Sequence, residues 1–234
     1  MSLRPLNTSQ KPPTFLPFTF SIAPDTDLWL KPAPLDKQSR SLPLNLNNQP
    51  TFYVSIPLSR FIRATTTISF MPTLQYGGDQ AGLVILYPDD ETKWIKGGLE
   101  YADDILKQSV VVTTGQDNGA DWSVSPPVSG TTDSTGRVRT VVECEREEEG
   151  TGASLLIRIG GEGVREVTWV FGASQDSNEE IWIGFFGAQP VKPDVAGTFE
   201  VQVEEWDLVV KERSGKTRRR WVLSSIQGSE GDMP

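Results

Sequence analysis

The stretch Asp79-Gln-Ala-Gly-Leu-Val-Ile-Leu86 indicates the fold class, because its apolar side chains alternate between the two faces of an extended chain. Leu83 and Ile85 share one face with Asp79. The same alternation recurs in Trp94-Ile-Lys-Gly-Gly-Leu-Glu-Tyr101 and in Ser109-Val-Val-Val-Thr113. Period-two alternation is typical of strands with one face on a hydrophobic core. The three stretches therefore predict three consecutive β-strands.

Similar alternation extends along most of the chain, between turn signals rich in Gly, Asp, Asn and Pro. The predicted strands cover residues 52–56, 62–70, 80–87, 93–101, 107–114, 137–146, 154–160, 164–171, 181–187 and 198–210. A final hairpin is predicted from residues 201–213 and 217–226, joined at Ser214-Gly215. Only residues 100–107 are compatible with a turn of helix. This many strands with so little helix predicts an all-β sandwich or barrel.

The organisation of the chain favours one domain of residues 1–227, with a flexible tail at 228–234. Ten of the 17 prolines fall in residues 1–60, which argues against helices there and favours short edge strands. The C-terminal hairpin spans residues 199–226. The sequence shows no internal repeat and no second-domain boundary.

Composition excludes several functional classes. The net charge of −9 disfavours nucleic acid as a partner, and no apolar run is long enough for a membrane span. The N-terminus lacks the apolar core of a secretory signal, and Cys144 is the single cysteine, so a cytoplasmic location is expected. The chain has no histidine, which removes Ser-His-Asp catalysis and ordinary zinc sites. We therefore expect no metal and no cofactor.

The faces of the first three strands that point away from the predicted core carry a cluster of polar and aromatic residues. They are Gln80, Trp94, Lys96, Glu100, Ser109 and Thr113, with Gly82 and Gly98 between them. Glycines inside strands often mark the close approach of a ligand or of another backbone. One interpretation is a concave ligand-binding face. The alternative is a half-solvated sheet face with a Lys–Glu ladder.

Three further features of the sequence can be interpreted as structural or as functional. Alternating carboxylates at Glu143, Glu145, Glu147 and Glu149 have a spacing compatible with a glycosidase pair, but a solvated acidic strand fits better because no aromatic residue follows. We interpret a basic cluster in residues 211–220 as protection of an edge strand against pairing with other chains. The alternative is a docking patch for an acidic partner or an anion. Cys144 alternates with Val142 and is expected in the core.

The motifs quoted above also carry a family resemblance. Tyr76-Gly-Gly-Asp-Gln-Ala-Gly-Leu83, the 94–101 and 109–113 stretches, and Asp121-Trp-Ser123 follow one another as in an uncharacterised family that includes the fungal regulation-of-enolase proteins. The similarity runs from about Phe18 to Val210. It implies a concanavalin A-like jelly-roll sandwich of two antiparallel sheets, and it adds Tyr76 and Trp122 to the predicted ligand site.

Two functional hypotheses follow. The first is a cytosolic binding or regulatory protein that takes a small organic or carbohydrate-like ligand, with a possible protein partner, and that is a monomer or weak dimer. The second is a cofactor-free enzyme (a lyase, a cyclase or a glycoside-acting enzyme). In that case Trp94 would stack on the substrate, Lys96 would be a cationic anchor and Glu100 the acid or base, with Gln80 and Thr113 as orienting donors.

Overall fold

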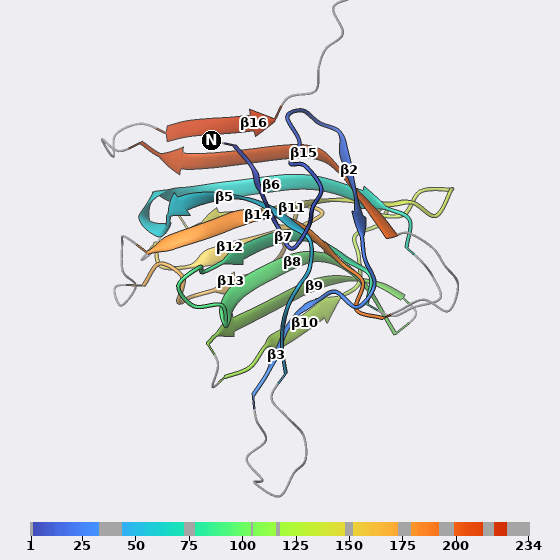
Figure 1. The fold of residues 1–234 in the computed structure, drawn as a ribbon, viewed down its shortest axis with the longest axis horizontal. Coiled ribbons are helices and arrows are strands. Elements are labelled where there is room, and N and C mark those ends of the chain that lie inside the picture. Colours follow the sequence, from blue (N-terminus) through green and yellow to red (C-terminus); the bar gives the residue numbers. More distant parts are fainter. Residues whose placement is uncertain are drawn as a thin grey trace, which may run out of the picture.

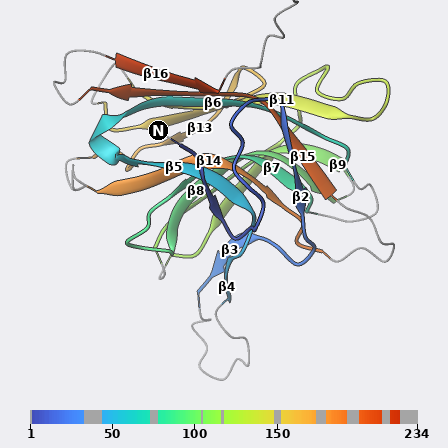
Figure 2. The ribbon, with the colours of Figure 1, turned by 45° about the horizontal axis from the view of Figure 1, so that its top comes forward.

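The computed structural model describes residues 2–32, 44–72, 78–103, 105–115, 118–147, 152–172, 179–191, 199–212 and 218–223. Two large antiparallel sheets stack face to face, and a small third sheet lies against the outer face of one of them (Figures 1 and 2). The predicted all-β sandwich is confirmed. In the described ranges, no helix is long and apolar enough to cross a membrane.

The first large sheet carries the three stretches that indicated the fold. In spatial order its strands are β1 (Arg4–Leu6), β5 (Thr51–Pro57), β14 (Glu180–Ala188), β7 (Gln80–Leu86), β8 (Lys93–Ala102), β9 (Ile105–Thr114) and β10 (Asp121–Ser125). Each strand pairs antiparallel with its neighbour. The register places Gln80 opposite Glu100 and Trp94 opposite Thr113, so side chains of the predicted site share one face.

The second large sheet is organised around the long strand β15. Its strands in order are β13 (Glu162–Val167), β12 (Leu155–Ile159), β11 (Val138–Arg146), β6 (Phe61–Phe70), β15 (Phe199–Lys211) and β16 (Arg218–Leu223). One edge of β15 pairs with β6, while the other pairs first with β2 (Phe18–Ile22) and then with β16. The β15–β16 pairing is the predicted C-terminal hairpin, of which residues 213–217 and 224–226 lie outside the described ranges.

The main core fills the space between the two sheets. Leu83, Ile85, Ile95, Leu99 and Val112 are buried there, on the face that the alternation predicted. They meet buried side chains of the second sheet, including Ile68, Val142, Cys144 and Ile157. Apolar burial of this kind contributes roughly 25 cal/mol per Å² and holds the two layers together.

A second, smaller core lies on the opposite face of the first sheet. The hairpin of β3 (Leu28–Lys31) and β4 (Leu44–Asn47) covers this face, and Leu28 and Leu30 project into it. They pack on Trp94, which is completely buried, together with Val84, Leu86, Val111, Phe186 and Ala188. The predicted open face is therefore partly covered. The prediction that Trp94 is an open stacking platform is wrong, because Trp94 is completely buried in the core that Leu28 and Leu30 of β3 share with the first sheet.

Gly82 and Gly98 have a structural explanation. They face each other across the β7–β8 pair, and a Cβ atom on either glycine would lie 2.7 Å from the Cα atom of the other. The close approach that strand glycines signal is thus between two backbones, rather than between a backbone and a ligand.

Some element boundaries differ from the sequence-based expectation. The described residues of 100–107 form no helical turn: β8 continues to Ala102 and β9 begins at Ile105. The strand expected at 164–171 ends at Val167. A short 3-10 helix at Leu58–Arg60 links β5 to β6.

Candidate functional site

A cavity of about 340 Å³ lies between β3 and the outer face of the first sheet. Its lining residues come from the β3 region, from strands β7 to β10 and from the turns at one end. They are Asp27, Trp29, Gly78, Gln80, Lys96, Glu100, Ala102, Asp103, Val111, Trp122 and Pro190. The strand register explains why Gln80, Lys96 and Glu100 meet here, since they alternate with core residues on adjacent strands.

Lys96 forms the inner wall of the cavity. The residue is only 2% exposed. Its Nζ atom donates to Asp27 Oδ1 at 3.0 Å and to Gln80 Oε1 at 2.8 Å. Burying an ammonium group requires a counter-charge and hydrogen bonds, and Asp27 and Gln80 supply both. The ammonium also lies 5.9 Å from the centre of the Trp94 ring. Because an ammonium has three donors, one N–H of Lys96 has no hydrogen-bond acceptor in the described part of the chain.

Glu100 lies beside Gln80 on the same face and is 8% exposed. Its Oε2 atom accepts a hydrogen bond from Trp122 Nε1 at 3.1 Å. The same indole N–H lies 3.1 Å from Ser109 Oγ. The other carboxylate oxygen of Glu100 has no hydrogen bond to any described residue. Glu100 is thus held in place through one oxygen and presents an acceptor through the other.

Two indole rings form an aromatic corner beside these polar groups. Trp29 from β3 and Trp122 from β10 have ring centroids 6.4 Å apart and an interplanar angle of 83°. Trp122 is 41% exposed, so part of its ring is open to solvent. Two perpendicular indoles present apolar faces in different directions, which suits a small ring with both apolar and polar edges.

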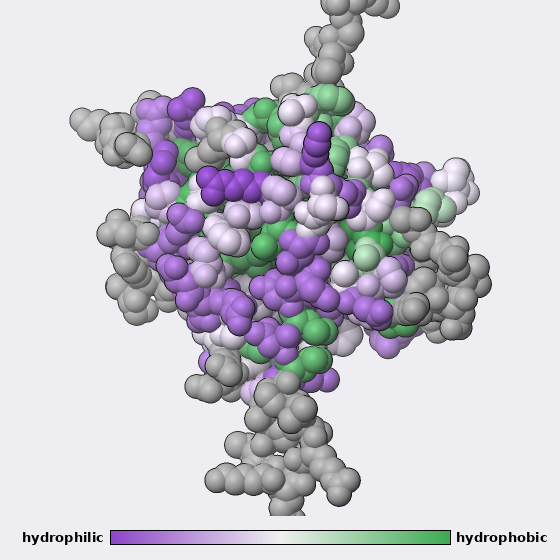
Figure 3. Space-filling model, in the orientation of Figure 1, coloured by the Kyte–Doolittle hydropathy of each residue, from purple (hydrophilic) through white to green (hydrophobic). Residues whose placement is uncertain are grey.

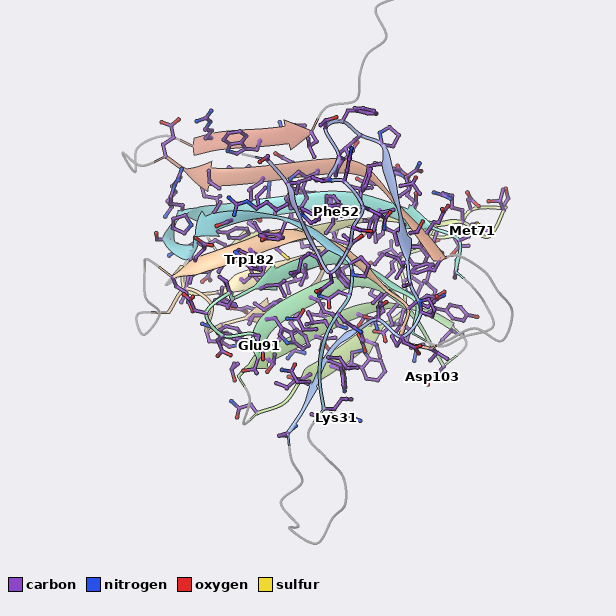
Figure 4. All side chains as sticks on the ribbon, viewed as in Figure 1. Lys31, Phe52, Met71, Glu91, Asp103 and Trp182 are labelled. Carbon is purple, nitrogen blue, oxygen red and sulfur yellow. The ribbon has the colours of Figure 1, made fainter. Side chains whose placement is uncertain are left out.

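Asp103 marks the end of the cavity at the β8–β9 turn, whereas Glu91 lies at the opposite end of β8 (Figure 4). Asp103 is paired with Lys107 on the neighbouring strand. The view over β3 shows a largely hydrophilic surface with small hydrophobic patches (Figure 3). The cavity lining combines charged and polar side chains with aromatic and aliphatic ones. No group of three metal-ligating carboxylate or thiol side chains occurs among the described residues.

The structure brings together part of the predicted site. Gln80, Lys96, Glu100 and Trp122 line the cavity, and Ser109 contacts it through the indole of Trp122. Two predicted members do not reach it. Trp94 is buried in the second core, and Thr113 hydrogen-bonds within its own turn, to Gly115. Tyr76 lies outside the described residues.

Among the cavity residues that the sequence-based prediction missed, Asp27 and Trp29 come from a distant part of the chain. Both come from the proline-rich N-terminal region, which was expected to form edge strands only. A usable signal existed in Asp27-Leu-Trp-Leu-Lys31, where Leu28 and Leu30 alternate with polar and aromatic residues. The unforeseen step was that this short strand folds over the face of the first sheet.

The other predicted clusters have partners on the outer face of the second sheet. Glu143 and Glu145 both accept hydrogen bonds from Arg158, at 3.0 and 2.7 Å, so they are not a free carboxylate pair. In the basic cluster, Arg220 pairs with Asp207 at 2.9 Å and Arg219 lies over the ring of Trp221. Glu149, Arg213 and Lys216 lie outside the described residues. These contacts are those of a charged, solvated sheet face.

Comparisons with known proteins agree with the fold. The sequence signature of a family described as "Protein of unknown function (DUF1349)" matches residues 16–209. An uncharacterized protein from Emericella nidulans is 34% identical over 176 residues, which cover 74% of this chain and 77% of that protein. A functionally unknown protein from Saccharomyces cerevisiae has a crystal structure with a TM-score of 0.60 at 18% identity, covering 89% of this chain and 96% of that one. The predicted sandwich of two antiparallel sheets is thereby confirmed.

Proposed function

This chain belongs to the DUF1349 family, and from that premise we propose that it binds a small polyhydroxylated, carbohydrate-like ligand in the cavity between β3 and the first sheet. One observation carries the proposal. A donor on Lys96 and an acceptor on Glu100, both on nearly buried side chains of one cavity wall, have no hydrogen-bond partner among the described residues.

Hydroxyl groups match this wall because each hydroxyl both donates and accepts hydrogen bonds. A ring bearing several hydroxyls can accept from Lys96 and donate to Glu100 at the same time. Its C–H face can then pack on the indole of Trp29 or of Trp122. Such a combination of a few fixed polar groups and apolar walls is characteristic of small-molecule sites.

Isothermal titration calorimetry with a panel of neutral monosaccharides and polyols tests this proposal. We expect saturable binding that falls at least about tenfold in Trp29→Ala. The matched control is Trp182→Ala, because Trp182 also packs partly buried against the second core but does not line the cavity. Equal loss in both variants, or no binding by the unmodified protein, would overturn the proposal.

A cofactor-free enzyme acting on the same class of ligand is the second candidate function. It is favoured by the free oxygen of Glu100, which could accept a proton from a bound hydroxyl or return one to a leaving group. Prolonged incubation with oligosaccharides, followed by mass spectrometry, tests for turnover. A product that forms equally with Glu100→Gln would exclude Glu100 as the acid or base.

The resemblance to the fungal regulation-of-enolase proteins supports a regulatory role in the cytoplasm as part of the same proposal. A fluorescent fusion of the protein should localise to the cytoplasm. Enolase activity should differ between extracts with and without the protein. Unchanged enolase activity would remove the regulatory part and leave the ligand site as proposed.

A further inference from the structure

We propose that the cavity prefers ligands bearing an ammonium group, as an amino sugar does, over the neutral and the acidic forms of the same sugar. This inference rests on the proposed function and adds a charge preference to it. The supporting observation is the uneven pairing of charges on the cavity wall.

Three carboxylates and one ammonium line the cavity among the described residues: Asp27, Glu100, Asp103 and Lys96. Two of the carboxylates have cationic partners. Asp27 pairs with Lys96 at 3.0 Å, and Asp103 pairs with Lys107. Glu100 has only the neutral N–H of Trp122. Lys107 lies opposite Glu100 in the β8–β9 register, but its ammonium pairs with Asp103. Among the described residues, the Glu100 carboxylate therefore has no ion pair of its own.

The position of this charge favours a strong interaction with a cation. Glu100 is nearly buried, so water screens its carboxylate less than it screens an exposed group. A hydrogen bond from an ammonium to a carboxylate is roughly twice as strong as one between neutral groups. The free oxygen of Glu100 can accept such a bond without breaking the contact to Trp122.

The indoles add to the preference for a cation. The electron-rich face of an indole attracts a cation placed within roughly 6 Å of the ring centroid. Trp122 binds Glu100 through its Nε1 edge and keeps part of its surface open. An ammonium hydrogen-bonded to Glu100 can therefore lie near this ring.

Lys96 favours an acidic ligand less strongly than Glu100 favours a cationic one. Its charge is already balanced by Asp27 and two of its donors are in use, so it offers one N–H rather than an unpaired positive charge. A ligand carboxylate would also be repelled by Glu100. The net charge of −9 acts in the same direction at longer range.

The test is calorimetric titration with glucose, galactose and mannose, each as the neutral, the 2-amino and the uronate form, at about pH 6, where the amine is protonated. In at least one series we expect the amino form to bind roughly tenfold more tightly than the neutral form, a difference of about 1.4 kcal/mol, and the uronate most weakly. Glu100→Gln keeps the acceptor for Trp122 and removes the charge. In this variant the amino preference should fall to about twofold or less, while neutral binding persists.

The outcomes separate the two proposals. Equal affinity for neutral and amino forms in the unmodified protein would overturn the charge preference and leave the proposed function intact. A tighter uronate would overturn it as well. No binding in any series would overturn the proposed function itself. The comparison among ligand forms needs no variant, so poor folding of Glu100→Gln would not prevent the test.

Discussion

The indole Nε1 of Trp122 lies 3.1 Å from Glu100 Oε2 and 3.1 Å from Ser109 Oγ, so one N–H is shared between a carboxylate and a hydroxyl on adjacent strands. This contact ties the edge strand β10 to the middle of the first sheet. It also fixes the orientation of Glu100, because the oxygen that accepts from the indole cannot turn into the cavity. Trp122 is therefore a positioning residue as well as a wall.

Trp122→Phe tests this positioning role. The variant keeps an aromatic ring and removes the N–H, so Glu100 loses its anchor. We expect the free energy of unfolding to fall by about 1 kcal/mol or less, because Trp122 is partly exposed. Ligand affinity, measured by calorimetry, should fall about fivefold or more because Glu100 is no longer held. Ser109→Ala is the control, since it removes the other acceptor of the Trp122 N–H. An equal loss of affinity in Ser109→Ala would contradict the role assigned to Glu100.

Leu99→Ala tests the assignment of strand faces. Leu99 is 1% exposed in the main core, and removing its side chain leaves a cavity. Chemical denaturation should show a loss of about 2–5 kcal/mol. Ile105, in the adjacent strand β9, is 58% exposed, and Ile105→Ala should change stability by about 0.5 kcal/mol or less. Similar losses in the two variants would mean that the faces are assigned incorrectly.

Gly82→Ala tests the close approach of β7 and β8. The added methyl would lie 2.7 Å from Gly98 Cα, and neither backbone can move away without disturbing the strand pairing. We expect a loss of about 3 kcal/mol or more, or failure to fold. Gly163, in β13, is the matched control, because a Cβ there meets no atom within 4 Å. Gly163→Ala should leave the thermal midpoint nearly unchanged.

The contrast between Leu99 and Trp94 shows how far the sequence could predict this structure. Local alternation predicted that Leu99 and Trp94 lie on opposite faces of β8, and the structure confirms this. Exposure depends on what covers a face, and the cover over Trp94 comes from Leu28 and Leu30, more than sixty residues earlier. Periodicity within a strand contains no information about such distant packing. For this reason the strands were predicted well, whereas Asp27 and Trp29 were missed.

The same limit changes the expectation for Lys96 and Glu100. As residues of an open face they would be partly exposed charges worth about 1 kcal/mol or less. They are in fact 2% and 8% exposed, and their partners are Asp27, just before β3, and Trp122 of β10. Charge and residue type could be read from the sequence, but burial and partner choice could not.

Cys144 gives a prediction about pH. Burial, with a smaller contribution from the charge of Glu143, raises the pKa of the Cys144 thiol from 9.0 to about 12. Above pH 9 the unfolded chain releases this proton while the folded protein retains it, so the unfolded state is favoured. The stability contributed by Cys144 is complete below pH 9 and declines between pH 9 and about 12.

Comparison with Cys144→Ala isolates this effect, because the variant keeps every other alkaline group. The stability advantage of the unmodified protein should shrink by up to about 1.4 kcal/mol per pH unit in that range, as measured by urea denaturation. A constant difference between the two proteins across the range would show that the folded thiol titrates as it does in the unfolded chain.

The Lys96–Asp27 ion pair, at 3.0 Å, provides the last prediction, since it joins β3 to the first sheet at the cavity wall. Lys96→Met removes the ammonium and leaves the Asp27 carboxylate, which is 13% exposed, without its counter-charge. We expect a loss of about 3 kcal/mol, because breaking one half of a buried pair leaves an uncompensated charge. The double variant Lys96→Met with Asp27→Asn should lose at least about 1 kcal/mol less than the sum of the two single variants. The exposed pair Arg139–Glu204 is the control, with an expected coupling of about 1 kcal/mol or less. If the Lys96–Asp27 coupling were equally small, the ion pair would not contribute to holding Asp27 at the cavity wall, and the packing of Leu28 and Leu30 alone would keep β3 on the first sheet.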